Sequence, residues 1–143
     1  MAQLTGTNKI KTAILFSGKG SNLKSLIIFS NKRMSPISID IIITNNPKAK
    51  GLNYSKIFNI KNKIVEYDNK YLAEKIILSE LKKFDVKLIC LAGFMKILSK
   101  KFIHNFKGKI LNIHPSLLPK YKGLKTHEKA IKNNEKFSGC TVH

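Results

Sequence analysis

Short apolar runs alternate along the chain with longer segments in which apolar residues recur at helical spacing. Runs of consecutive β-branched and apolar residues predict strands over 11–16, 37–43, 63–67, 86–92 and 109–114. Apolar residues three or four positions apart predict helices over 23–30, 48–58, 71–81 and 99–106. Strands that alternate with helices in this way indicate parallel βαβ units with right-handed crossovers. We therefore expect a doubly wound, mostly parallel α/β sheet in a single domain over residues 1–143.

The stretch KGKILNIHPSLLPKYKG, residues 107–123, departs from this pattern because two polar residues interrupt a predicted strand just before a proline ends it. The two-residue period of a strand places Asn112 and His114 on one face, and Leu111 and Ile113 are expected to bury on the other. An Asn amide can donate to a developing oxyanion, and a neighbouring His can donate or move a proton. The pair thus suits addition to a carbonyl carbon, although a hydrogen-bonded structural His is the commoner outcome for such an isolated pattern.

The segment SGKGSN, residues 17–22, follows the first predicted strand and opens the first predicted helix. Gly18 and Gly20 permit a tight turn there, and the free N–H groups at a helix start favour an anion. The spacing matches neither a dinucleotide-binding fingerprint nor a Walker loop, and glycine turns after strands are common. A phosphate cradle and a plain turn both stay open on this segment alone.

The formal net charge of +19 comes from 27 basic residues, of which only Arg33 is an arginine. The lysines are spread along the whole chain among many Ile and Asn residues, which favours a compositional bias over a dedicated nucleic-acid surface. Proteins that read bases rely on Arg forks and aromatic platforms, and both are sparse here. A nucleic-acid binder is therefore the less favoured interpretation and stays open as an alternative, whereas a basic field would attract small anionic substrates at low salt.

Membrane insertion, secretion and a disulfide framework are all disfavoured. No apolar run approaches the roughly 20 residues that span a bilayer, and the start MAQLTGTNKIK lacks the apolar core of a signal peptide. Cys90 and Cys140 lie in apolar segments without a C-x-x-C pair or histidines at ligand spacing. We expect a cytoplasmic protein with two buried thiols and no metal site.

Three motifs in this order and spacing closely resemble those of the glycinamide ribonucleotide formyltransferase family: SGKGSN, LAGFMKILS (91–99) and LNIHPSLLPKYKGLKTHEKAI (111–131). The resemblance spans essentially the whole chain. It implies a Rossmann-like enzyme of purine biosynthesis that uses 10-formyltetrahydrofolate as formyl donor and 5′-phosphoribosylglycinamide as acceptor, without a metal. Related transferases acting on methionyl-tRNA differ after Gly123, where this chain continues LKTH.

The same resemblance implies roles for individual residues. Catalytic positions are matched by Asn112, His114 and His143, and the contact with the ribonucleotide is matched by Gly20, Ser21 and Asn22. The folate site is matched by Lys70, Met95, Lys96, Ile97, Leu98 and Asn112, and the backbone of 95–98 is expected to bind the pterin. Relatives often carry Arg where this chain has Lys96, and the alignment at Lys70 is loose.

One departure concerns the end of the sequence. In this family an aspartate shortly after the position of His143 hydrogen-bonds the catalytic His, and the sequence ends at His143. We therefore expect a formyltransferase domain without its C-terminal strands, and impaired activity for residues 1–143 alone. Two alternatives stay open: a non-catalytic, truncated paralogue that binds folate or nucleotide, and a formyltetrahydrofolate deformylase, although the latter normally has a further N-terminal domain. A homodimer also stays open.

Overall fold

The computed structural model describes residues 8–143. Contacts divide the chain into two compact units, one up to Ile110 and the other from Leu111 onward, and each is described by itself. In chain order the elements are β1 (Ile10–Phe16), α1 (Ser21–Ser30), β2 (Ile37–Thr44), the 3-10 helix η1 (Lys50–Leu52), α2 (Asn53–Ile57), β3 (Lys61–Ile64), α3 (Lys70–Lys83), β4 (Leu88–Leu91), α4 (Lys100–Asn105), β5 (Lys109–His114), α5 (Thr126–Lys132) and β6 (Thr141–Val142).

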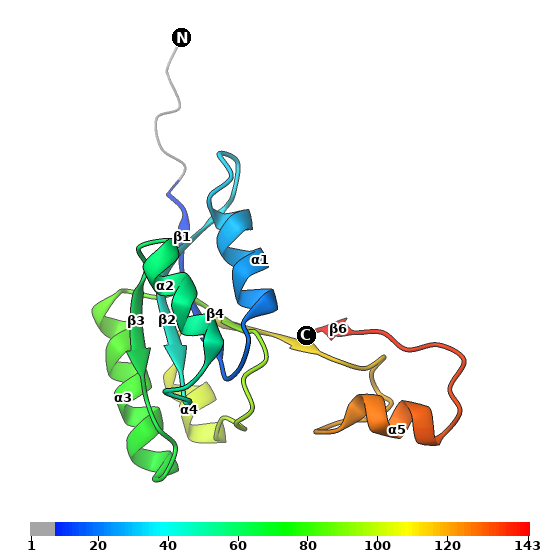
Figure 1. Ribbon diagram of the computed structural model, residues 1–143. Helices are drawn as coiled ribbons and strands as arrows, with labels where there is room; N and C mark the ends of the chain where they lie inside the picture. The colour runs from blue at the N-terminus through cyan, green and yellow to red at the C-terminus, as the bar shows by residue number, and fades with distance from the viewer. Residues whose placement is uncertain (1–7) are drawn as a thin grey trace. The chain divides into compact units, whose positions relative to one another are not determined.

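The first unit is built on a parallel sheet in the order β3-β2-β1-β4 (Figure 1). Strand β1 pairs in parallel with both β2 and β4, and β2 pairs in parallel with β3. The first residue of β5 joins this sheet because Lys109 N donates to Lys87 O at 2.9 Å. In the second unit, the end of β5 pairs antiparallel with β6. The predicted doubly wound, mostly parallel α/β sheet is confirmed.

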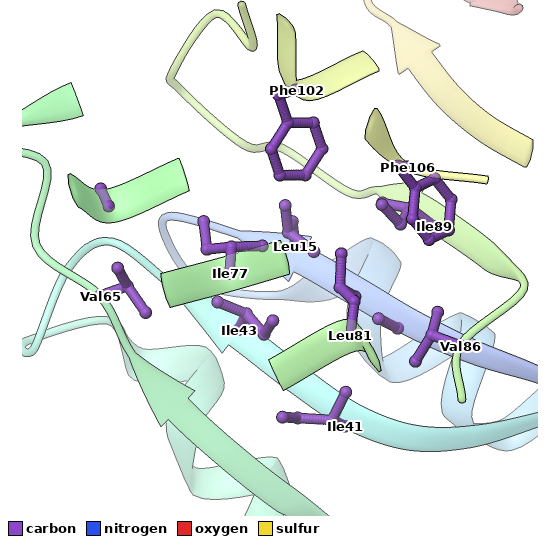
Figure 2. Close-up of a cluster of buried hydrophobic side chains, with 12 residues drawn as sticks. Leu15, Ile41, Ile43, Val65, Ile77, Leu81, Val86, Ile89, Phe102 and Phe106 are labelled. Atoms are coloured by element: carbon purple, nitrogen blue, oxygen red, sulfur yellow. The ribbon is translucent and has the colours of Figure 1, made fainter. Parts of the chain in front are cut away.

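Side chains that alternate along the central strands fill two cores, one on each face of the sheet. On the first face, Ala13 and Leu15 of β1 lie with apolar residues of α3 and α4, as Figure 2 shows for Leu15, Ile77 and Phe102. On the second face, Ile14 and Phe16 lie with Leu23 and Ile27 of α1. Helices therefore cover both faces, which leaves the carboxyl ends of the strands as the edge where loops can form a site.

Helix α3 shows how the sequence specifies one of these layers. Asn69 caps its start by accepting a hydrogen bond from Leu72 N at 3.1 Å. Ala73, Ile77 and Leu81 recur every four residues, so they share one face and bury against the sheet.

Among the described residues, no helix is long and apolar enough to cross a membrane.

We expect Ile77→Ala to lower the free energy of unfolding by about 2–5 kcal/mol, because a fully buried side chain is replaced by a cavity. The preceding residue, Ile76, is 44% exposed on the same helix, so Ile76→Ala is the matched control and should change stability by under about 1 kcal/mol. Urea denaturation of both variants measures the difference. Equal losses would contradict the assignment of Ile77 to the core.

Some expectations about local structure are wrong. The third strand covers Lys61–Ile64 rather than 63–67, and all four of its residues are exposed, as is common for an edge strand. The chain then turns inward to bury Val65. The single helix predicted over 48–58 is divided into η1 and α2, and Gly51 of η1 lies so close to the Phe16 ring that a Cβ there would clash.

Two predicted burials in the second unit are also wrong. Cys140 is exposed, whereas Cys90 in β4 is buried as expected. Leu111 is 42% exposed rather than buried. The fully buried side chains of this unit are the polar Ser116 and Thr126, so residues 111–143 do not enclose an apolar core of their own.

Candidate functional site

The turn between β1 and α1 has the geometry of an anion cradle. Gly20 occupies the N-cap position with φ 78, and no side chain caps the helix start. The first backbone N–H groups of the ten-residue helix, including those of Ser21 and Asn22, therefore lack partners within the helix. Such groups, with the helix dipole behind them, can bind a phosphate. The predicted turn at the helix start is confirmed, and phosphate binding stays a prediction.

Gly51, which the sequence analysis did not single out, supports this turn. Its N–H donates to Gly18 O at 3.1 Å. A Cβ on Gly20 would lie 2.9 Å from the Gly51 Cα, and a Cβ on Gly51 would lie 2.5 Å from the Phe16 ring. The turn is therefore held by two backbones in close contact. A glycine inside a predicted helix was the sequence signal for such an approach.

The segment after β4 presents a row of exposed side chains on a fixed backbone. Met95 and Ile97 are 62% and 81% exposed, whereas Phe94 and Leu98 are partly buried and pack against the first core. The inward residues fix the segment, and the outward side chains leave apolar surface exposed. This agrees with the placement expected for a folate loop, although folate binding by 95–98 stays a prediction.

A polar cavity of about 360 Å³ adjoins this segment at the carboxyl ends of the strands. Its lining includes Ser17, Tyr67 and Lys96. The Lys96 ammonium lies 5.9 Å from the centre of the Tyr67 ring, which suits a cation–π contact. Burial, followed by the charge of Glu74, raises the pKa of Tyr67 to about 12, so its hydroxyl stays protonated. Lys70 is exposed at the first position of α3.

In the second unit, Asn112 is hydrogen-bonded to His143. The two residues exchange backbone hydrogen bonds at 2.7 and 3.0 Å, and Asn112 Nδ2 lies 3.0 Å from His143 Nε2. An amide nitrogen donates its hydrogens, so His143 Nε2 is the acceptor in this contact. One N–H of the Asn112 amide therefore fixes the side chain, and the second N–H and the carbonyl oxygen are left for a substrate.

His114 is oriented by the turn that follows β5. Its Nε2 lies 3.0 Å from Tyr121 O, and a carbonyl oxygen can only accept, so this nitrogen carries the proton. The His114 and His143 rings meet edge to face with centroids 6.1 Å apart. Asn112, His114 and His143 thus lie together, and the catalytic roles that the resemblance implies for them stay predictions.

Tyr121 and Glu135, to which the sequence analysis gave no role, hold this turn in place. The Tyr121 hydroxyl donates to Glu135 Oε1 at 2.7 Å, and Lys120 Nζ lies 2.9 Å from the same oxygen. Hydrogen bonds from Lys120 and Tyr121 hold the pKa of the Glu135 carboxyl below its usual range. A carboxylate therefore supports His114 indirectly, through the Tyr121 backbone. The long spacing between these residues gave no signal in the sequence.

The arrangement offers donors for an oxyanion and a nitrogen that can accept a proton. Because Nε2 of His114 donates to Tyr121 O, Nδ1 is the ring nitrogen left to take up a proton. Among residues 8–143, no three His, Cys, Asp or Glu residues gather in a group that could hold a metal ion. Asn112 and His114 offer hydrogen bonding and proton transfer.

Comparison with known proteins gives consistent results. The family model described as formyl transferase matches residues 10–143. The phosphoribosylglycinamide formyltransferase of Haemophilus influenzae is 42% identical over 136 residues, which cover 93% of this chain and 64% of that protein. The human trifunctional purine biosynthetic protein adenosine-3 is 41% identical over 138 residues, which cover 94% of this chain and 14% of that protein.

Solved structures agree. The crystal structure of phosphoribosylglycinamide formyltransferase from Anaplasma phagocytophilum matches with a TM-score of 0.89 and 41% identity, over 95% of this chain and 64% of that one. The corresponding structure from Brucella melitensis matches with a TM-score of 0.88 and 37% identity, over 95% and 72%.

The chain thus spans 64% of the Haemophilus relative and a much smaller share of the trifunctional proteins. The resemblance to glycinamide ribonucleotide formyltransferases that the three motifs indicate is confirmed by these matches. The match covers both units, from the start of β1 to His143. The chain belongs to the formyl transferase family.

Proposed function

We propose that the protein transfers the formyl group of 10-formyltetrahydrofolate to the primary amine of 5′-phosphoribosylglycinamide, a step of purine biosynthesis. The names of the relatives support the acceptor and the pathway. Membership of the family supports a folate-type formyl donor. The surplus of basic residues suits two anionic substrates.

The observation that carries this proposal is the Asn112 amide held by His143, beside His114 and at the end of a β-strand. In the proposed reaction the amine nitrogen attacks the formyl carbon, and the carbonyl oxygen becomes an oxyanion. The free Asn112 N–H stabilises that oxyanion, and His114 donates to it as well once Nδ1 has taken up a proton. The bond between the formyl carbon and N10 then breaks, the amine proton passes to N10, and formylglycinamide ribonucleotide and tetrahydrofolate are released.

The first unit would bind the two substrates. The free N–H groups at Gly20, Ser21 and Asn22 would hold the ribonucleotide phosphate. The backbone of 95–98 would bind the pterin, with the exposed Met95 and Ile97 beside it. Lys70 is proposed to attract the carboxylates of the folate. Holding both substrates together supplies much of the rate advantage, because a bimolecular step becomes effectively unimolecular.

The test follows the fate of the formyl carbon. Residues 1–143 are continued by the C-terminal part of the Haemophilus relative, which supplies the aspartate expected after His143; we call this the extended protein. With a formyl-labelled donor and 5′-phosphoribosylglycinamide, we expect the label in the ribonucleotide. Label released as formate without acceptor would indicate a deformylase. No loss of label from the donor, despite binding of both ligands, would indicate a non-catalytic binding protein.

A further inference from the structure

The segment from Gly93 to Ser99, which we call the donor loop, is fastened at both of its ends by side chains outside it. At its end, Ser99 N donates to Glu74 Oε1 at 2.7 Å, and the Ser99 hydroxyl donates to Glu74 Oε2. At its beginning, Met95 N donates to Ser17 Oγ at 2.8 Å. Ser17 N also donates to Gly93 O at 3.1 Å. The residues between these ends include the exposed row described above.

Glu74 is unusual among the acidic residues because it is buried. It is 7% exposed on α3, between Ala73 and the core residue Ile77. Burying a carboxylate is costly unless hydrogen bonds satisfy it, and both of its oxygens are used by Ser99. The buried carboxylate therefore holds Ser99 at the end of the loop.

The two fastenings extend into the rest of the site. Ser99 Oγ also accepts from Phe102 N at 3.0 Å, so the group that Glu74 holds is the cap of α4. Ser17 donates to Asn45 Oδ1 after β2, and its carbonyl oxygen accepts from Asn46 Nδ2 at 3.1 Å. The donor loop is thus tied to the ends of β1 and β2 on one side and to α3 on the other.

We propose that Glu74 is a positioning residue for the formyl donor: with Ser17 it clamps the donor loop, so that the backbone of 95–98 is in its binding shape before the folate arrives. This inference rests on the proposed function of that backbone. A preorganised loop loses little freedom on binding, which favours affinity. Without the clamp, part of the binding free energy would be used to order the loop.

The test compares Glu74→Ala with Glu80→Ala in the full chain. Glu80 lies on the same helix and pairs with Lys63 at 3.9 Å, far along α3 from the loop. We expect Glu74→Ala to weaken the binding of 10-formyltetrahydrofolate by about 10- to 100-fold, the usual worth of hydrogen bonds to a charged group. Calorimetric affinity for 5′-phosphoribosylglycinamide should be unchanged in both variants, and Glu80→Ala should bind folate normally.

Amide hydrogen exchange supplies a second readout that folate binding does not affect. Peptides covering 93–102 should exchange faster in Glu74→Ala, because Ser99 N loses its acceptor and the cap of α4 loosens. Glu74→Gln keeps an acceptor for Ser99 N and should restore part of both the protection and the affinity. It also replaces the alanine variant if that one does not fold.

The possible outcomes distinguish a failure of the proposed function from a failure of the positioning role of Glu74. A parent protein that binds no folate would overturn the proposed function, and the positioning role with it. A parent that binds folate and a Glu74→Ala variant that binds it equally well would overturn the positioning role alone, whether or not exchange in the loop increases. Weaker folate binding with faster exchange confined to 93–102 supports the proposal.

Discussion

Asn112→Ala in the extended protein should lower kcat by about 10²- to 10³-fold, the usual loss when one oxyanion donor is removed. The Asn112 side chain is held by His143 at 3.0 Å, so its remaining N–H is already directed when the substrate arrives. The KM for each substrate should change little, since the interaction forms only as charge develops in the transition state. Steady-state kinetics with both substrates varied in turn measures this.

The matched control for that variant is Asn133→Ala. Asn133 is exposed and donates to Lys129 O at 2.8 Å just after α5, in the same unit as Asn112. The Asn133→Ala variant of the extended protein should retain nearly full kcat. An Asn112→Ala variant with a kcat within a few-fold of the parent would remove this amide from the chemistry.

Gly20→Val should damage the phosphate cradle and leave the folate site largely intact. The residue has φ 78, where side chains other than glycine are strained, and a Cβ would lie 2.9 Å from the Gly51 Cα. We expect a loss of stability of about 1–3 kcal/mol from the strain. If binding 5′-phosphoribosylglycinamide requires the same strain to be overcome, the affinity for it falls about 5- to 150-fold. Calorimetric titration of both ligands measures the loss of ribonucleotide affinity and the loss of folate affinity separately.

The neighbouring Gly18 provides the control for that variant. A Cβ on Gly18 would meet no atom within 4 Å, so Gly18→Ala should fold and bind both ligands. Equal loss of both affinities in Gly20→Val would indicate a general folding defect, and an unchanged ribonucleotide affinity would remove this turn from the site.

The architecture could be predicted from the sequence because the strong signals are local. The strand that became β1 and the helix that became α3 are set by apolar runs and by residues four apart, and both were placed to within a residue or two. The weak strand β3 and the region of η1 were misplaced. Their limits depend on contacts distant in sequence, such as Gly51 against Phe16.

In the candidate site, too, residues with a local sequence pattern could be predicted and residues placed by distant contacts could not. Asn112 and His114 could be identified because they interrupt an apolar run at alternate positions, and the motifs extend this to His143. The role of Glu74 could not be identified from the sequence, because its partner Ser99 lies 25 residues away and a Glu in a helix is ordinary. Tyr121 acts through its backbone oxygen, which any residue would supply. Side chains that support a site through the fold leave no local pattern.

The central claim is that this chain supplies the oxyanion-stabilising Asn112 of a glycinamide ribonucleotide formyltransferase, and growth without purines tests it most directly. The host is a bacterial strain from which every enzyme that formylates 5′-phosphoribosylglycinamide has been deleted. We expect the extended protein to restore growth, and its Asn112→Ala variant to do so poorly or not at all. If the extended protein is folded and abundant in the cells but does not restore growth, the claim is contradicted; growth with Asn112→Ala at the parent's rate would contradict it equally.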